Sequence, residues 1–240
     1  MKKCIISLLL SLFIVTAFCQ DYNFVVRGKY LRPVKKEKLN EARYISDLIP
    51  GYPTNWIIQY VSVEILATCN GNTVKAESTN NTLSTIQKSI LNSADLASDI
   101  VIKVVYKYKN AATDIIENYR MNTMVTVVPE TEAQYIGGYQ ALKKYLQENG
   151  INKIIEPDRI EKLLTGNLFL PPAKPAVVFF TVNEQGEIVN AKISNTSGNA
   201  KTDKILLEAI NKMPTWKPAE NEKGKKVKQE FKFTVGKGGC

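Results

Sequence analysis

Histidine is absent from the 240 residues of the chain. Without imidazole, the chain can form neither a Ser-His-Asp nor a Cys-His catalytic arrangement, nor a metal site built on histidine. Acidic residues gather at the end of a strand pattern and in a lysine-rich loop, 220–226, where a solvated and charge-balanced surface explains them. We therefore predict no catalytic residues, no metal site and no cofactor.

Long hydrophobic runs are also missing. The apolar run at residues 4–18 is shorter than the ~20 residues of a membrane-spanning helix. It follows Lys2-Lys3 and ends in the small-x-small pattern Ala17-Phe18-Cys19, which predicts a signal peptide, residues 1–19, cleaved after Cys19. Two alternatives stay open, namely a lipidated Cys19 and an uncleaved segment that anchors the chain in the inner membrane.

Cysteine is scarce, and cleavage would leave Cys69 and Cys240. An oxidising compartment permits a disulfide between them, but the sequence does not place them within bridging distance. The simpler interpretation is a buried Cys69 on a strand and a free cysteine in a flexible tail, residues 237–240. The net charge is +9, yet the lysines are dispersed and no arginine-rich helix is present, so we predict no nucleic-acid partner.

The apolar pattern of the remaining chain is typical of an α+β protein with two domains. Residues 20–129 read as a β-rich domain with one or two short helices, because stretches such as 55–67 and 99–108 are rich in β-branched and aromatic residues. Asn70-Gly71 predicts a two-residue hairpin. Residues 130–236 read as a smaller αβ domain, in which Gly137-Gly138 opens a helix that ends at Asn149-Gly150. A further short helix is expected at residues 157–164.

The last third of the chain has a distinctive order of elements. Alternating runs at 177–182 and 187–193 flank a turn that ends at Gly186, which indicates a β-hairpin. A one-sided helix follows at 200–213, and the connector 213–219 leads to a lysine-rich loop and an alternating final strand, 227–235. Trp216 lies between two prolines of that connector, and we interpret it as a core residue.

These residues resemble the C-terminal domain of TonB-family energy transducers. The resemblance is carried by Gly186-x-Ile188, the short helix, Pro214-x-Trp216-x-Pro218-Ala219, Gly224-Lys225-x-Val227 and the alternating final strand. It covers residues 131–236, with Ile136 to Leu146 as its upstream part. It implies a small αβ domain with an antiparallel sheet. In this family the edge of the final strand pairs with an extended segment of an outer-membrane transporter, which implies partner binding at Gln229, Phe231, Phe233 and Val235.

The chain departs from the family because it has no long proline-rich spacer, and a β-rich domain stands in that place. The resemblance therefore favours a non-enzymatic periplasmic binding or adaptor protein that engages an envelope partner, such as a TonB-dependent transporter, by β-strand pairing. A membrane-anchored energy transducer is an alternative. Coverage of the final strand by the first domain, or by a second copy in a homo-oligomer, also stays open. The order of elements in residues 20–129 weakly resembles C-terminal domains of gliding-motility periplasmic shaft proteins, which leaves a scaffold of a secretion machine as a third hypothesis.

Overall fold

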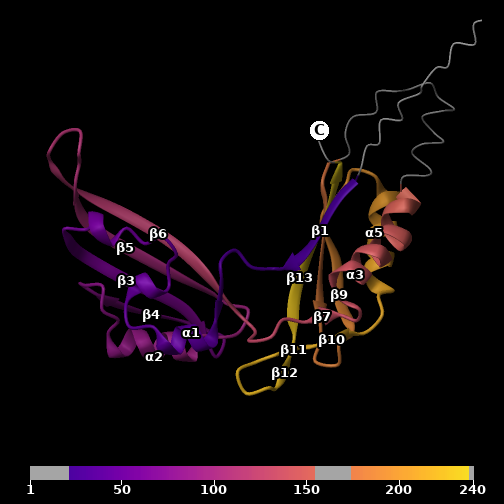
Figure 1. Cartoon of the computed structure of the whole chain (residues 1–240), viewed down its shortest axis with the longest axis horizontal. Helices are drawn as coiled ribbons and strands as arrows, with labels where there is room; N and C mark the ends of the chain where they lie inside the picture. Colours follow the sequence, from indigo (N-terminus) through magenta and orange to yellow (C-terminus); the bar gives the residue numbers. More distant parts are fainter. Residues whose placement is uncertain (1–21, 155–173, 238–240) are drawn as a thin grey trace, which may run out of the picture.

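The structure, a computed structural model, describes residues 22–154 and 174–237. Figure 1 shows two units, each with a sheet that carries helices on one face. The N-terminal unit holds residues 33–128, and the C-terminal unit holds residues 22–28 together with the chain from residue 134 onward. Each unit has its own hydrophobic core. The expected α+β class, with a β-rich first part and a small αβ second part, is confirmed.

The N-terminal unit is a five-stranded sheet in the order β2-β6-β5-β3-β4. Its strands are β2 (Pro33–Lys35), β3 (Gln59–Cys69), β4 (Asn72–Ser78), β5 (Asp99–Lys109) and β6 (Ile116–Val128). Its helices are α1 (Lys36–Glu41), α2 (Thr85–Ser93) and the two 3-10 helices Ile45–Asp47 and Thr54–Trp56. The strands are antiparallel except for β2, which runs parallel to β6.

Local sequence signals explain how this unit folds. Asn70 and Gly71 both have positive φ, at 50° and 76°, so the predicted hairpin between β3 and β4 is confirmed. The Ser84 hydroxyl caps α2 by accepting from the Gln87 N–H at 3.2 Å, and the Gln87 side chain donates to the Val63 carbonyl at 2.9 Å. One buried glutamine thus joins the start of α2 to β3. Cys69 is buried on β3, as expected; Cys240 lies outside the described residues.

The C-terminal unit is built on an antiparallel sheet in the order β1-β13-β8-β9. Its strands are β1 (Tyr22–Gly28), β8 (Ala176–Val182), β9 (Ile188–Asn195) and β13 (Gln229–Lys237). Two short ladders join β7 (Gln134–Tyr135) to β10 (Trp216–Lys217) and β11 (Ala219–Glu220) to β12 (Lys226–Val227). The helices α3 (Gly138–Leu146) and α5 (Ala200–Asn211) cover one face of the sheet (Figure 1). Within residues 22–154 and 174–237, no helix covers the opposite face, which we call the open face.

The strand at the beginning of the described chain corrects the expected domain boundaries. We expected residues 20–129 to form one domain, but β1 pairs with β13 along its whole length and so belongs to the C-terminal sheet. Phe24 and Val26 alternate along β1, and they pack against the C-terminal core. The N-terminal unit is therefore an insertion between β1 and the rest of the C-terminal unit. The expected boundary at 129–130 follows directly after β6 and stays a prediction.

The helical segment around Gly150 differs from the prediction. We expected Asn149-Gly150 to end the helix that begins with α3, with Gly150 in the left-handed conformation. Instead the chain continues as a π-helix, Gln147–Ile151, and Gly150 has no positive φ. A Cβ on Gly150 would lie 3.6 Å from the Ala209 side chain, an ordinary contact distance, so this segment packs beside α5 without requiring glycine. The helix expected at 157–164 lies outside the described residues.

Candidate strand-pairing site

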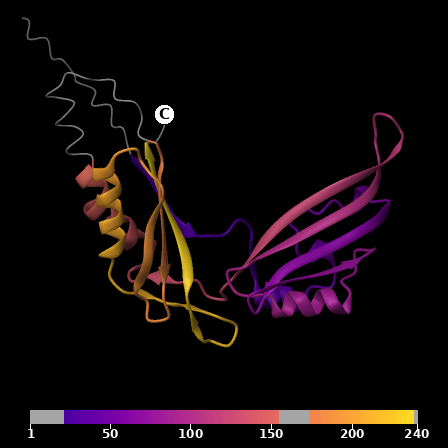
Figure 2. The same ribbon diagram turned by 180° about the vertical axis from the view of Figure 1, so that it is seen from behind.

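The final strand, β13, lies inside its sheet. It pairs with β8 on one side, from Gln229↔Val182 to Val235↔Ala176, and with β1 on the other. Figure 2 shows the same neighbours from behind. The edge of β13 is therefore not unpaired in this structure, because β1, a strand from the part expected to form the first domain, covers it. This is one of the alternatives that the sequence left open. The outer edges of this sheet, among the described residues, are β1 and β9.

The four residues expected to contact a partner have buried side chains. Gln229, Phe231, Phe233 and Val235 are 5%, 4%, 0% and 3% exposed. Phe231 stacks on Phe180 with ring centroids 5.4 Å apart, and Phe233 meets Phe24 edge-on at 6.1 Å. These four side chains of β13 are thus buried on the core side of the sheet. The part of β13 that another strand can contact is its backbone, along the edge that β1 now occupies.

Gln229 belongs to a polar network where the chain crosses between the two units. Its side-chain oxygen Oε1 accepts from the Ala133 backbone N–H at 2.7 Å, and its side-chain Nε2 donates to the Glu132 carboxylate at 3.2 Å. Glu132 also accepts from the Tyr30 hydroxyl at 2.9 Å. Burial, together with this hydrogen bond and the charge of Glu132, raises the pKa of Tyr30 to about 12. The network fixes the end of β1 and the linker 129–133 to the start of β13, and sequence patterns gave no sign of it.

β1 is held mainly by its backbone ladder. Phe24 and Val26 are half-buried, whereas Asn23, Val25 and Arg27 are exposed. Beyond the strand, Lys29 forms an ion pair with Glu230 at 2.6 Å, and both side chains are nearly half exposed. Exposed ion pairs contribute only about 0–1 kcal/mol. β1 therefore contributes fewer buried side chains than β8 or β13, and removing it would leave most of the C-terminal core in place.

The open face of the C-terminal sheet carries a row of cations. Arg27 lies opposite Lys232, Lys232 opposite Phe179, and Phe179 opposite Lys192, so one row crosses all four strands. Like charges directly opposite on a sheet are unfavourable. Among the described residues, none of these three cations forms an ion pair within 4.0 Å. We call Arg27, Lys232 and Lys192 the cationic row.

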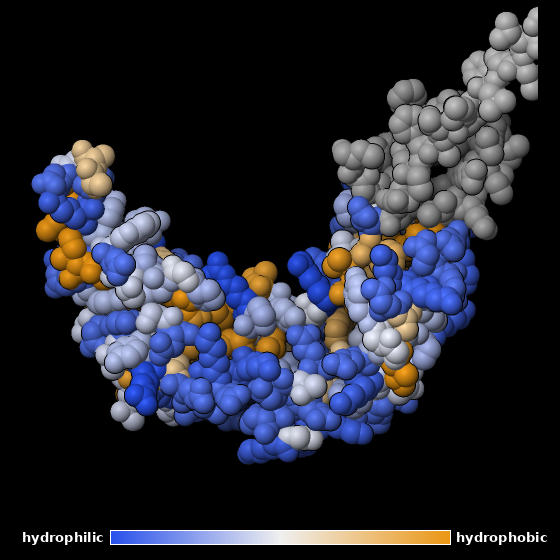
Figure 3. Space-filling view, viewed as in Figure 1, coloured by the Kyte–Doolittle hydropathy of each residue, from blue (hydrophilic) through white to orange (hydrophobic). Residues whose placement is uncertain are grey.

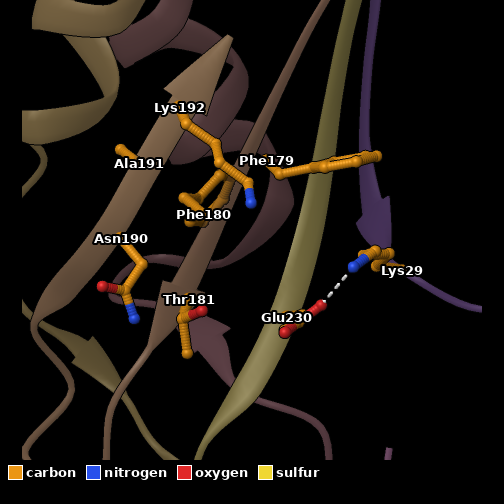
Figure 4. A pocket seen from close by; sticks show the side chains of 8 residues that line it. All are labelled: Lys29, Phe179, Phe180, Thr181, Asn190, Ala191, Lys192 and Glu230. Carbon is orange, nitrogen blue, oxygen red and sulfur yellow. Dashed lines mark hydrogen bonds and ion pairs between the residues drawn. The ribbon is translucent and has the colours of Figure 1, made fainter. Parts of the chain in front are cut away.

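A hollow of about 400 Å³ lies beside one end of this row, where Phe179 and Lys192 line it. Figure 4 shows Lys192 and Phe179 projecting on the open face, with the Lys29–Glu230 ion pair beside them. The Lys29 ammonium lies 4.9 Å from the centroid of the Phe179 ring, which is a cation–π contact. This surface combines an apolar ring with several positive charges and one carboxylate. Such a surface suits an acidic chain segment that lies across the strands.

Trp216 anchors the connector to the core, which confirms the prediction from its position between prolines. It is 3% exposed and packs against Tyr135, Phe180 and Phe231 with centroid distances of 5.6, 6.0 and 5.1 Å. Its backbone N–H donates to the Gly186 carbonyl at 2.8 Å. The turn after β8 and the Trp216 connector are therefore one packed unit at the end of the sheet.

A partly buried carboxylate organises the loop between β9 and α5. Asp203 accepts from the Ser197 N–H at 2.9 Å, from the Ser197 hydroxyl at 2.7 Å, and from the Thr196 hydroxyl. Burial alone would raise the pKa of Asp203, but these hydrogen bonds outweigh it and hold the pKa below its usual value. The ionised form of Asp203 therefore stabilises the fold.

Replacing this carboxylate should lower stability in a pH-dependent way. Asp203→Asn is expected to reduce the free energy of unfolding at pH 7 by about 1–2 kcal/mol, because hydrogen bonds to a charged group are lost. A depressed pKa contributes stability above the unfolded pKa and loses it as pH falls through the folded pKa. The difference from wild type should thus shrink below about pH 4 in urea titrations. Asp114→Asn, at an exposed residue, is the control and should change the free energy of unfolding little. A stability difference between Asp203→Asn and wild type that stays constant from pH 7 to 3 would contradict the role of the ionised Asp203.

The comparison with protein families identifies the second unit. The model of a family described as TonB C terminal matches residues 158–235. This part of the chain is a TonB C-terminal domain. The match includes β8, β9, α5 and β13 up to Val235, and it leaves out β1 and the whole N-terminal unit. The resemblance noted from the sequence is confirmed for these residues, while its upstream part, Ile136 to Leu146, stays a prediction.

A TonB C-terminal domain indicates a TonB-type protein of the cell envelope. Comparisons with curated proteins and with solved structures gave no match. The likeness of the first unit to gliding-motility shaft proteins is therefore untested and stays a prediction. In the part of the chain that the structure describes, no helix has the length and apolar character needed to span a membrane.

Proposed function

We propose that this chain is a non-enzymatic periplasmic adaptor whose TonB C-terminal domain engages an extended segment of an outer-membrane transporter by β-strand pairing. The observation that carries the proposal is the ladder between β1 and β13, which runs from Tyr22↔Lys237 to Gly28↔Phe231. A strand remote in sequence already pairs with this edge of β13. The edge therefore has the backbone geometry that an added strand requires.

In this proposal the partner strand takes the place of β1. Gln229, Phe231, Phe233 and Val235 keep their side chains in the core, and the strand offers backbone N–H and C=O groups to the partner. The partner replaces Phe24 and Val26, which are the half-buried apolar side chains of β1, with alternating apolar side chains of its own. β1 thus covers the edge until a partner arrives and limits pairing with other chains, as natural sheets require of an exposed edge.

The cationic row gives the pairing a charge preference. A strand at the β1 position would place alternate side chains on the open face, beside Lys232. Removal of β1 also removes Arg27 from its place opposite Lys232, so the repulsion between these two positive charges is relieved. Acidic side chains on the partner strand would pair with Lys232 instead. We therefore propose that preferred partner segments alternate apolar and acidic residues.

A binding experiment tests strand pairing. The chain from Gln20 onward is titrated with synthetic plug-linker segments of outer-membrane transporters from the same cells, and binding is followed by calorimetry. The matched control is the same peptide with alternate backbone amides N-methylated, which keeps every side chain but removes ladder donors. The proposal predicts saturable binding that N-methylation abolishes. Absence of binding at millimolar peptide, or equal binding of both peptides, would contradict it.

The N-terminal segment decides between the adaptor and its alternatives. Residues 1–21 lie outside the described residues, and the signal peptide with cleavage after Cys19 stays part of the proposal. The intact mass of the protein taken from its native envelope separates the cases. A species that begins at Gln20 supports the adaptor, whereas a membrane-bound species that retains Met1 supports an energy transducer. An acylated Cys19 would indicate a lipoprotein.

A further inference from the structure

The N-terminal unit carries an aromatic groove that the proposed strand pairing does not use. Its volume is about 640 Å³, which lies within the range of ligand sites, roughly 300–1,000 Å³. The aromatic groove is lined by Gly51, Tyr52, Pro53, Thr54, Asn55, Trp56, Tyr106, Tyr108, Tyr119 and Met121. Five of these ten residues are aromatic and none is charged.

Two elements build the groove. Tyr106 lies opposite Tyr119 in the ladder between β5 and β6, and Tyr108 follows two residues along the same face of β5. The Tyr119 ring lies 5.6 Å from that of Tyr106 and 5.8 Å from that of Tyr108, the latter edge-on at 81°. The 3-10 helix Thr54–Trp56 and the turn before it supply the other wall. The groove is therefore open along its length, between a sheet and a loop.

The exposure of these rings is more than the fold requires. Trp56 is 71% exposed and Tyr119 is 52% exposed, although each could bury about 150–250 Å² in a core or an interface. Figure 3 shows hydrophobic side chains at the surface of the N-terminal unit, toward its outer end. Large exposed aromatic rings that line one groove mark a candidate binding site.

The chemistry of the lining defines the ligand. The groove carries no charge on a chain whose net charge is +9, so it suits an uncharged ligand. It offers flat aromatic faces together with donors, namely the Trp56 indole N–H, the Asn55 amide and the Tyr119 hydroxyl. The Tyr108 hydroxyl is already engaged, since it donates to Glu117 at 3.0 Å. The lining contains no carboxylate, so a ligand with apolar rings and free carbonyl acceptors fits these faces and donors.

We propose that the aromatic groove binds an uncharged, proline-rich segment of a partner protein in the polyproline II conformation. Such a segment has no internal hydrogen bonds, so its carbonyls are free to accept from the tryptophan and tyrosine donors. Proline rings pack flat on aromatic faces, and the preformed conformation reduces the entropy lost on binding. A carbohydrate would also stack on the rings, and it is therefore the competing ligand in the test below. The site is independent of strand pairing at β13.

The two tryptophans give a direct readout on the full chain. Trp56 is exposed in the groove and Trp216 is buried, so a ligand in the groove should shift the emission of the exposed tryptophan to the blue. The probe is decaproline, with an uncharged Gly-Ser peptide of equal length and a neutral oligosaccharide as comparison ligands. We expect saturable decaproline binding tighter than about 1 mM, and no binding of the other two.

Variants followed by calorimetry locate the site. Trp56→Ala and Tyr119→Ala should each weaken decaproline binding at least about 10-fold, because each removes an exposed aromatic contact. Tyr139→Ala is the matched control, since Tyr139 is an exposed tyrosine on α3, and it should bind as wild type. Circular dichroism melts show whether each variant folds. If one groove variant does not fold, the other still tests the site. No decaproline binding, binding unchanged in both groove variants, or binding of the oligosaccharide alone would overturn the proposal.

Discussion

Joining β1 to β13 through a disulfide is expected to abolish partner binding, with an affinity loss of at least about 100-fold. Val25 and Thr234 lie opposite each other on the two strands, and both point to the open face. Directly opposed residues have Cα separations of about 4.5–5.5 Å, which is within disulfide reach. In the double variant Val25→Cys, Thr234→Cys, the oxidised protein cannot release β1, so a partner strand finds no edge on β13.

Reduction supplies the matched control in the same molecule. Dithiothreitol should restore transporter-segment binding to the double-cysteine variant, and Val25→Ser with Thr234→Ser should bind as wild type. Cys240 is replaced by serine throughout, to prevent mixed disulfides, whereas Cys69 is buried and is kept. Equal binding in the oxidised and reduced forms would show that the partner pairs elsewhere, such as at the outer edge of β9.

Gly186→Ala is expected to destabilise the C-terminal unit by about 3–5 kcal/mol. Gly186 has a φ of +85°, and a Cβ at this residue would lie 2.0 Å from the Trp216 carbonyl oxygen and 3.0 Å from the Thr215 methyl. The neighbouring atom is backbone and is held by the hydrogen bond between Trp216 and Gly186. The turn and the Trp216 connector must therefore separate, which exposes part of the core.

Gly224→Ala separates the steric clash from the backbone conformation. Gly224 has a φ of +69°, but no atom lies within 4 Å of the position of its Cβ. The alanine should therefore lower the free energy of unfolding by only about 1–2 kcal/mol, through the left-handed conformation alone. Chemical denaturation followed by Trp216 fluorescence measures both variants. Equal losses at the two glycines would contradict the proposed contact with the connector.

Elements that depend on near neighbours could be predicted from the sequence. Asn70-Gly71 specified its hairpin because few residue pairs accept positive φ at both central positions. The hairpin of β8 and β9, the helix α5 and the burial of Trp216 follow from alternation, one-sided periodicity and flanking prolines. In each case the determining residues lie within a few positions of the element itself.

Contacts between distant segments could not be predicted in this way. The alternation of β13 is the same whether one or two strands flank it, so the pattern does not reveal that β1 covers its outer edge. Nothing in the local sequence of Phe24 and Val26 indicates a partner at the other end of the chain. The helix end expected at Gly150 was wrong because glycine permits a left-handed helix end but does not require it, and here the helical backbone continues through Gly150.

The two candidate sites differ in how far the sequence reveals them. The strand-pairing residues were named from the family resemblance, but the prediction missed that their side chains are buried and that the backbone is the available surface. The aromatic groove was not anticipated, although a signal exists. Tyr106 and Tyr108 are two residues apart, which places them on one face of a strand. Their meeting with Trp56 depends on the fold of a loop and could not be read from spacing.

Hydrogen exchange of the backbone amides, with and without a transporter segment, tests the central claim most directly. The account predicts that amides 22–28 lose protection when the segment is added, while amides 229–237 stay protected because a new strand replaces β1 on the same edge. The contrary result is continued protection of β1 together with new protection of residues 188–195. That outcome would place the partner on β9 and would contradict the exchange of β1 for a partner strand.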